Sequence, residues 1–514
     1  MSDPLAAGGI ASSAAGLWPR FTVEGVPGGL PRPGEPLAIL AEVRVTESFL
    51  AERCPAVFLP IRATLSVRVT DYDGKEIAAR SVEGTFPGVA RLDFGRAPGP
   101  GYYSLRSELR SPDGRLVRRF HPGGFSVVLG NAAQRERLAR KKTWCSWYYA
   151  FSDWDSFAPW LERMGIFKNV GSTPGAPAWA EAKWKDASSR GIVLFADFAG
   201  DSHWLNNSES DARALVEMAA RYTRHFKSVN EIDGRQGPEW LAARAPAKWV
   251  ERAKWQHEAV HAARADALYV GGSLYCSGVD RPRGPGDPSP REWFRRCLEL
   301  GLDRYVDAWD VHVYPHNPPR LEASSASDGS LEADRGVLDV YAELGRRNEK
   351  PFFLGETSAL VWHGFAGLRW QADTIAKMIA WANSRADWLG IAFCAPHHDR
   401  RITAEEYAMA HDPGEAAMYT ASALVDGRPY RRIASDDPEL QAAWFGDTLM
   451  VWRSDERTTG WSARLDGAGP WLLVDVVGRA RPLEVEHDLA RFRIGQSPVY
   501  VLAQTEYQRL TRGE

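Results

Sequence analysis

Two glutamates lie where apolar runs stop: Glu231 in Ser-Val-Asn-Glu-Ile-Asp-Gly and Glu356 in Phe-Phe-Leu-Gly-Glu-Thr-Ser. Each run predicts a strand buried on both faces, so the carboxylate at its end would lie at the rim of a sheet, held by rigid backbone. Hydrolysis of a glycosidic bond requires two carboxylates facing one cleft, one of which donates a proton to the leaving oxygen. Glu231 and Glu356 are therefore the catalytic candidates.

The central part of the chain, residues 131–411, must position these glutamates. It repeats an apolar strand, a polar loop and an amphipathic helix, which predicts an α/β protein with a (β/α)8 TIM barrel. A doubly wound open sheet is the alternative, but no glycine-rich phosphate loop follows the first strand. The expected strands are 143–149, 167–172, 192–198, 228–232, 268–274, 306–313, 352–355 and 390–394, and the expected helices include 211–226, 245–263, 331–348 and 371–384.

Segments rich in β-strand patterns flank the barrel. Residues 18–130 contain short alternating runs that end in Asp-Gly turns, which predicts an immunoglobulin-like β-sandwich. Residues 412–514 return to the same pattern and predict a C-terminal β-sandwich domain, whereas residues 1–17 are small and polar and predict a flexible leader. A chain of 514 residues agrees with several domains, because single cores stop growing near roughly 250–300 residues.

Composition excludes some classes of partner. The net charge of −3, with arginines scattered among acids, argues against a nucleic-acid or anionic-membrane surface. The N-terminus lacks a basic segment followed by an apolar one, and no later run is long enough to span a membrane. We expect a cytoplasmic protein, or a secreted or periplasmic one if a leader was removed. The 21 tryptophans favour a carbohydrate ligand only weakly, since large aromatics mostly serve packing.

Neither the cysteines nor the histidines predict a metal site. The five cysteines are widely spaced without a Cys-x-x-Cys pair, so we expect free buried thiols. The cluster His397-His398-Asp399 was the metal candidate, but adjacent histidines point apart on extended backbone and no third ligand follows at helical spacing. We expect no metal and no cofactor.

The residues beside the two glutamates give a resemblance. Asn230 precedes Glu231 at the expected strand four, and Gly355 precedes Glu356 at the expected strand seven. This pattern resembles the clan A glycoside hydrolases, retaining (β/α)8 enzymes with an Asn-Glu acid/base after strand four and a nucleophilic Glu after strand seven. Within the clan, the chain is most similar to family 39, whose members pair a barrel with β-domains.

The resemblance implies a role for each matching residue. Glu356 would attack the anomeric carbon, while Glu231 would protonate the leaving oxygen and then activate water. Asn230 would donate a hydrogen bond to the sugar 2-hydroxyl. His312 and Tyr314 match a His-x-Tyr string often found on strand six of such enzymes. Glu231 then needs a raised pKa from partial desolvation, whereas hydrogen bonds from Tyr314 and His312 would keep Glu356 ionised.

The chain departs from the clan pattern in two places. The expected strand two reads Phe-Lys-Asn-Val-Gly-Ser and lacks the arginine that many members direct at the nucleophile. The expected strand eight has Phe393 where many members have a tryptophan that forms the floor of the sugar site, and Phe393 is the substrate-binding candidate at that position. Residues near other strand ends are candidates for a sugar subsite, with ordinary packing an equal alternative: Tyr148, Asp197, Trp204 and Trp362.

These observations predict a retaining glycoside hydrolase that cleaves an oligo- or polysaccharide. The first alternative is a carbohydrate-binding barrel that has lost catalysis, which the missing arginine favours. The second is a barrel hydrolase that uses a metal. The carbohydrate is the expected partner, while the sugar, the linkage, endo or exo action and a homo-oligomeric state are left open.

Overall fold

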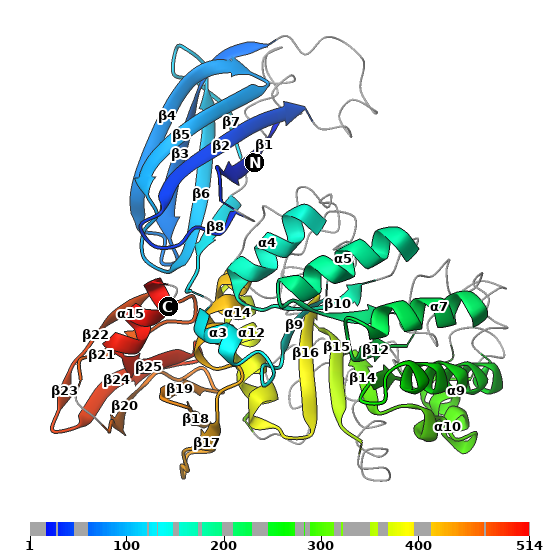
Figure 1. Ribbon diagram of the computed structural model, residues 1–514. Coiled ribbons are helices and arrows are strands. Elements are labelled where there is room, and N and C mark those ends of the chain that lie inside the picture. The colour runs from blue at the N-terminus through cyan, green and yellow to red at the C-terminus, as the bar shows by residue number, and fades with distance from the viewer. Residues whose placement is uncertain are drawn as a thin grey trace.

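The chain folds into a central barrel with a β-sandwich on one side and a second β-domain on another (Figure 1). The computed structural model describes residues 17–26, 29–45, 60–120, 123–130, 132–146, 154–172, 177–197, 209–228, 245–272, 282, 288–312, 320–321, 350–357, 368–394, 413–466 and 469–512.

Eight parallel strands close into a barrel, and their order around the ring follows the order of the chain. The predicted TIM barrel is therefore confirmed, because an open doubly wound sheet would leave two edge strands. The strands are β9 (Thr143–Ser146), β10 (Lys168–Ser172), β11 (Val193–Asp197), β12 (His225–Lys227), β13 (Leu268–Gly271), β14 (Ala308–His312), β15 (Phe352–Thr357) and β16 (Trp388–Cys394).

The fourth barrel strand lies earlier in the chain than predicted. We expected residues 228–232, but β12 spans His225–Lys227, and the Ser228 N–H continues the ladder by donating to the Val270 carbonyl at 2.9 Å. His225 and Lys227 are polar, so the apolar pattern placed the strand on the residues that follow them. The predicted position of this strand along the chain was therefore wrong. Asn230 and Glu231 lie beyond the described part of this segment.

Helices surround the barrel on its outer face (Figure 1). The last of them, α14, is fully buried against α12, although we had predicted that its residues belong to the C-terminal domain. The expected helix 331–348 lies outside the described residues. The helices are α4 (Trp154–Met164), α5 (Pro177–Ser189), α7 (Glu209–Ala220), α9 (Pro246–Ala263), α10 (Pro290–Glu299), α12 (Leu368–Ser384) and α14 (Pro413–Leu424). Among the described helices, none is long and apolar enough to cross a membrane.

The barrel strands separate two apolar layers. Side chains that point inward form a cluster made only of strand residues, in which the rings of Trp144, Phe195 and Phe353 lie 4.8–5.8 Å apart. Side chains that point outward, such as Phe226 and Trp309, pack against the helices in a larger core. Because side chains alternate along a strand, membership of one layer indicates the direction of the neighbouring residues.

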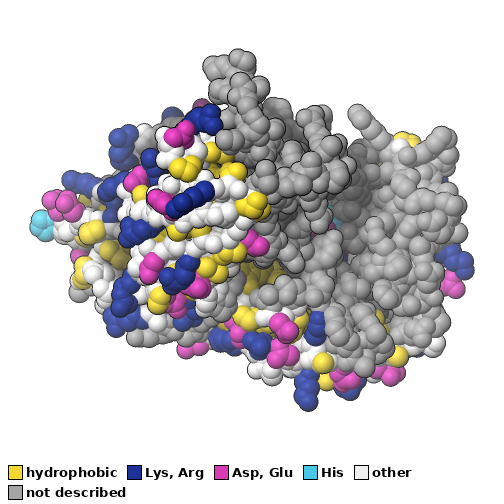
Figure 2. All heavy atoms as spheres, turned by 90° about the horizontal axis from the view of Figure 1, so that it is seen from above, with side chains coloured by type: hydrophobic (Ala, Val, Ile, Leu, Met, Phe, Trp, Pro, Cys, Tyr) yellow, Lys and Arg dark blue, Asp and Glu magenta, His cyan; other side chains and the backbone are white. Residues whose placement is uncertain are grey.

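The N-terminal β-sandwich has two antiparallel sheets, as predicted. One contains β1, β2 and β5, and the other contains β4, β3, β6 and β7, with β8 paired to β6. Basic and acidic side chains alternate over the coloured surface on the left of Figure 2. The strands are β1 (Leu17–Val23), β2 (Pro36–Val45), β3 (Ile61–Asp71), β4 (Glu76–Phe86), β5 (Gly88–Arg96), β6 (Gly101–Arg110), β7 (Leu116–Arg119) and β8 (Gly123–Val127), followed by the helix α3 (Ala132–Glu136).

The C-terminal β-domain also has two sheets. The larger runs in the order β17, β18, β19, β25, β21, β22, and the smaller in the order β20, β24, β23. The strands are β17 (Tyr430–Arg432), β18 (Leu440–Phe445), β19 (Thr448–Arg453), β20 (Thr459–Arg464), β21 (Trp471–Val474), β22 (Ala480–Leu483), β23 (Val485–Glu486), β24 (Leu489–Ile494) and β25 (Val499–Ala503), followed by the helix α15 (Gln504–Arg512).

One turn of the N-terminal sandwich contacts both other parts. Arg479 of the C-terminal domain donates to Asp73 at 2.7 Å, and Arg369 of α12 donates to the same carboxylate at 3.0 Å. The guanidinium of Arg369 also stacks 4.6 Å above the Tyr72 ring. The Asp-Tyr-Asp-Gly turn after β3 therefore fixes the sandwich to the barrel and to the C-terminal domain.

Candidate active site

Four charged side chains lie together inside the barrel, toward the carboxyl ends of its strands. Lys227 ends β12, Asp310 and His312 are on β14, and Glu356 is near the end of β15. We call these four residues the charge layer. The side chains of Lys227, Asp310 and His312 are completely buried, whereas that of Glu356 is 17% exposed. The layer lies at the end of the barrel where active sites of this fold are built.

The distances in the charge layer form a chain that ends on Glu356. Lys227 Nζ lies 3.3 Å from Asp310 Oδ2 and 3.3 Å from His312 Nε2. His312 Nε2 lies 3.3 Å from the same Asp310 oxygen, and His312 Nδ1 lies 3.7 Å from Glu356 Oε2. The imidazole thus bridges a fully buried ion pair and the one partly exposed carboxylate.

The doubly protonated His312 ring directs an N–H at both carboxylates beside it. In that state Nε2–H faces Asp310 Oδ2 at 3.3 Å and Nδ1–H faces Glu356 Oε2 at 3.7 Å. A neutral ring directs a lone pair at one of the two carboxylates: at Asp310 if the proton is on Nδ1, where Lys227 can then donate to Nε2, and at Glu356 if the proton is on Nε2. In the charged ring and in the Nδ1–H tautomer, an N–H of His312 points toward Glu356.

Asp310 is ionised although it is buried. Burial alone would raise the pKa of the carboxyl, but the positive charges of Lys227 and His312 outweigh it and hold the pKa of Asp310 below its usual value. A charge of this kind is tolerated in an interior only when a partner of opposite sign is adjacent. Asp310 therefore fixes the position and charge of its two neighbours.

Gly355 leaves the space that the Asp310 carboxylate occupies. A Cβ at residue 355 would lie 1.9 Å from Asp310 Oδ1, closer than any real contact between these atoms. The glycine in the Gly-Glu pair thus has a steric cause, because only a residue without a side chain allows β14 to place Asp310 against β15.

An irregular end to β15 turns Glu356 toward the charge layer. Phe353 belongs to the inner apolar cluster and Leu354 to the outer core, so regular alternation would direct residue 356 outward. The pairing of β15 shifts register on both sides, after Leu354 toward β16 and before His312 toward β14. Such irregularities change the direction of a side chain, and they bring Glu356 to His312.

Comparison with known proteins gives likenesses in structure alone. No model of a known family matches the sequence, and no curated protein matches it. A family 39 glycoside hydrolase from the gut symbiont Bacteroides cellulosilyticus WH2 has a similar structure, with a TM-score of 0.57 and 13% sequence identity, over 86% of this chain and 95% of that one. At this level of identity, the likeness concerns the fold alone.

Two further glycoside hydrolases match with lower scores. A family 51 α-L-arabinofuranosidase from Bifidobacterium longum has a TM-score of 0.44 at 12% identity, over 71% of this chain and 96% of that one. A family 44 xyloglucanase from Paenibacillus polymyxa has a TM-score of 0.42 at 10% identity, over 63% and 84% of the two chains. The likeness to the family 39 protein extends beyond the barrel, because it includes most of both chains.

The barrel brings together two of the residues that the sequence singled out, His312 and Glu356. Asp197 ends β11, where only its backbone is described. The remaining candidates that concern the mouth of the barrel lie outside the described residues: Tyr148, Trp204, Asn230, Glu231, Tyr314 and Trp362.

Phe393 does not form the floor of a sugar site, which corrects the prediction from the sequence. Its side chain is only 2% exposed and packs in the outer core with the helices. Its neighbour Ala392 belongs to the inner cluster, so alternation along β16 sends Phe393 outward. An aromatic residue at the end of strand eight can contact a sugar in the barrel only if its side chain points inward. The side chain of Phe393 lies on the outer face of the strand.

Sequence reasoning missed Lys227 and Asp310. A signal for Asp310 was present, since Asp310, His312 and Tyr314 are spaced by two residues in Asp-Val-His-Val-Tyr and alternation places such residues on one face of a strand. Lys227 had a weaker signal, a lysine within an otherwise buried strand. Both residues are recognisable only once their strands, which lie on either side of β13, are known to direct these side chains into the barrel.

We predict that Gly355→Ala disrupts the charge layer. The added methyl group cannot coexist with the present position of Asp310, so we expect a loss of at least about 2 kcal/mol in the free energy of unfolding. Denaturant unfolding measures it. Gly460→Ala in β20 is the matched control, because no heavy atom lies within 4 Å of its added Cβ. Equal stability of the two variants would contradict the packing described.

Proposed function

We propose that the protein is a retaining glycoside hydrolase in which Glu356 is the nucleophile. The observation that carries the proposal is the position of Glu356, which is the one partly exposed member of a buried charge layer at the end of barrel strand seven. A nucleophilic carboxylate needs contact with substrate and neighbours that stabilise its negative charge. Its exposure serves the first requirement, and His312 Nδ1 at 3.7 Å serves the second.

The charge layer supplies what the missing strand-two arginine would have supplied. Lys227 and Asp310 orient the His312 ring, and the N–H on Nδ1 stabilises ionised Glu356 electrostatically. The distance of 3.7 Å is long for a hydrogen bond, but catalytic contacts often tighten when substrate binds. Glu356 Oε attacks the anomeric carbon as the bond to the leaving oxygen breaks, which forms a glycosyl ester on the enzyme.

Glu231 is the proposed acid/base. It would protonate the leaving oxygen in the first step and remove a proton from the attacking water in the second. A retaining enzyme requires the two carboxyl groups to be about 5–5.5 Å apart. Glu231 follows β12, and Lys227 at the end of β12 belongs to the same charge layer as Glu356. The substrate class we propose is an oligo- or polysaccharide, with Asn230 directed at the sugar 2-hydroxyl.

A panel of aryl glycosides that covers the common sugars in both anomeric forms tests the proposal. We expect turnover of at least one member, with the anomeric configuration of the first product retained when followed by proton NMR. A product of inverted configuration would refute the double displacement. Sugar binding without turnover over the whole panel would favour the alternative of a carbohydrate-binding barrel.

We predict that Glu231→Ala separates the two chemical steps. For substrates with poor leaving groups, kcat/KM should fall by about 10²–10⁴-fold, because protonation of the leaving oxygen is lost. For aryl glycosides with very good leaving groups, the first step should persist and release a burst of aglycone. Stopped-flow absorbance measures the burst. An equal loss for good and poor leaving groups would remove Glu231 from the acid role.

A further inference from the structure

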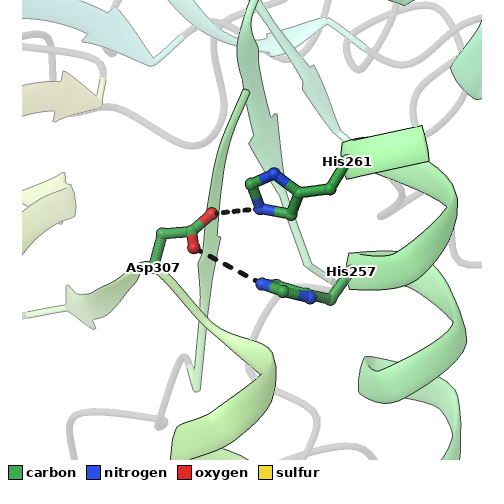
Figure 3. A group of neighbouring side chains, drawn as sticks. All are labelled: His257, His261 and Asp307. Atoms are coloured by element: carbon green, nitrogen blue, oxygen red, sulfur yellow. Dashed lines mark hydrogen bonds and ion pairs between the residues drawn. The ribbon is translucent and has the colours of Figure 1, made fainter. Parts of the chain in front are cut away.

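Three metal-ligating side chains meet on the outside of the barrel, apart from the charge layer. His257 and His261 are on α9, and Asp307 immediately precedes β14. Figure 3 shows both imidazole rings directed at the one carboxylate. His257 Nε2 lies 3.4 Å from Asp307 Oδ1, and His261 Nε2 lies 2.9 Å from Asp307 Oδ2. One ligand atom of each residue lies within 4.8 Å of the other two.

The helix explains why the two rings converge. Residues four apart on an α-helix lie on the same face, so His257 and His261 project side by side, with ring centroids 4.4 Å apart. The string from residue 257 to 261 reads His-Glu-Ala-Val-His, the spacing at which helical histidines bind zinc. The expectation that the protein has no metal site rested on residues 397–399 and did not take this string into account.

We propose that His257, His261 and Asp307 bind one divalent transition-metal ion of the Zn²⁺ type. Two imidazole nitrogens and one carboxylate oxygen are donors that zinc prefers, at about 2.0–2.2 Å. Ligand atoms at such distances around a tetrahedral ion lie roughly 3.4 Å from one another. The two nitrogen-to-oxygen distances already approach that spacing, so small side-chain rotations suffice to admit the ion.

The surroundings support the ligands in two ways. The Tyr269 N–H donates to Asp307 Oδ2 at 2.7 Å, while the Asp307 N–H donates to the Tyr269 carbonyl at 2.8 Å, so the carboxylate is held in place. The three ligand side chains are 23–28% exposed, which gives an ion access from solvent and leaves a coordination position for water.

The site serves to tie elements together rather than to hydrolyse a substrate. Asp307 immediately precedes β14 and His312 ends it, so the two residues lie roughly 16 Å apart along an extended strand. In a metalloprotease with this motif, the glutamate at the position of Glu258 is the general base. Here the Glu258 side chain is 55% exposed, and its Oε1 lies 4.0 Å from Lys254 Nζ. The bound ion would therefore fasten α9 to the start of β14.

Zinc binding by the full chain tests the proposal, with Zn²⁺ itself as the probe. After removal of metal, equilibrium dialysis should show one equivalent of Zn²⁺ more for the wild type than for the double variant His257→Gln/His261→Gln. The melting temperature of the wild type should rise by several degrees with Zn²⁺, because an ion that binds only the folded state stabilises it. That of the double variant should not change.

Glutamine is chosen because it still hydrogen-bonds Asp307 but is a poor zinc ligand, so the metal-free variant should remain folded. His487→Asn is the control, since His487 is exposed and has a φ of 49°, which asparagine tolerates. That variant should bind Zn²⁺ as the wild type does. Equal Zn²⁺ binding by the wild type and the double variant would overturn the proposal, as would a wild-type melting temperature that Zn²⁺ leaves unchanged. The readouts do not depend on glycosidase activity, so the metal site and the proposed function can fail separately.

Discussion

Replacing Glu356 with alanine is expected to abolish turnover, lowering kcat by at least about 10⁴-fold, because loss of a nucleophile removes the first chemical step. The side chain is partly exposed, so the folded state should survive the change. The measurement is the hydrolysis rate of whichever aryl glycoside the wild type cleaves best. Circular dichroism establishes that the variant is folded.

Azide distinguishes a lost nucleophile from a damaged site. In the cavity left by Glu356→Ala, azide nitrogen can bond to the anomeric carbon while the bond to the aglycone breaks, which yields a glycosyl azide of inverted configuration. We expect azide to restore aglycone release in this variant. Glu299→Ala on α10 is the control, because Glu299 is 60% exposed on the outside of the barrel. Wild-type activity in Glu356→Ala would refute the assignment.

The barrel was predictable because its sequence pattern is local. Seven of the eight strands were placed within a few residues, since an apolar run between turn residues depends only on its own segment. The fourth was misplaced because the residues of β12 that face the interior are His225 and Lys227. A strand whose inward face is polar does not show the continuous apolar pattern of a buried strand.

The candidate site was predictable only in part, because it depends on contacts between distant strands. Glu356 and His312 were predicted from their resemblance to a family pattern, whereas Lys227 and Asp310 belong to no such pattern and are 83 residues apart in the chain. The direction of the Glu356 side chain follows from register shifts on both sides of β15, and the sequence Gly-Glu-Thr does not predict these shifts. The prediction for Phe393 was wrong for a related reason. A shift of one residue along a strand moves a side chain from its inner to its outer face.

Breaking the buried ion pair of Lys227 and Asp310 is expected to destabilise the fold strongly. Lys227→Met removes the ammonium that lies 3.3 Å from the Asp310 carboxylate, and Asp310→Asn removes the carboxylate that lies 3.3 Å from the Lys227 ammonium. Each single variant should lose about 3–5 kcal/mol in the free energy of unfolding, because an uncompensated charge remains in the interior. Asparagine retains the shape that fits against Gly355, so the loss reports charge and not volume.

The double variant separates stability from function. Lys227→Met/Asp310→Asn buries neither charge, so its unfolding free energy should fall by clearly less than the sum of the two single losses. Activity should not recover, because His312 has lost both charged groups that orient its ring. We expect kcat to remain about 10²-fold below wild type while KM changes little, since a misplaced catalytic group affects the chemical step rather than binding.

The exposed pair Lys248–Glu251, at 2.9 Å, is the matched control, and its removal should change stability by less than about 1 kcal/mol. Recovery of kcat in the double variant would show that His312 needs neither partner, and strictly additive losses of stability would show that the two buried charges are not coupled.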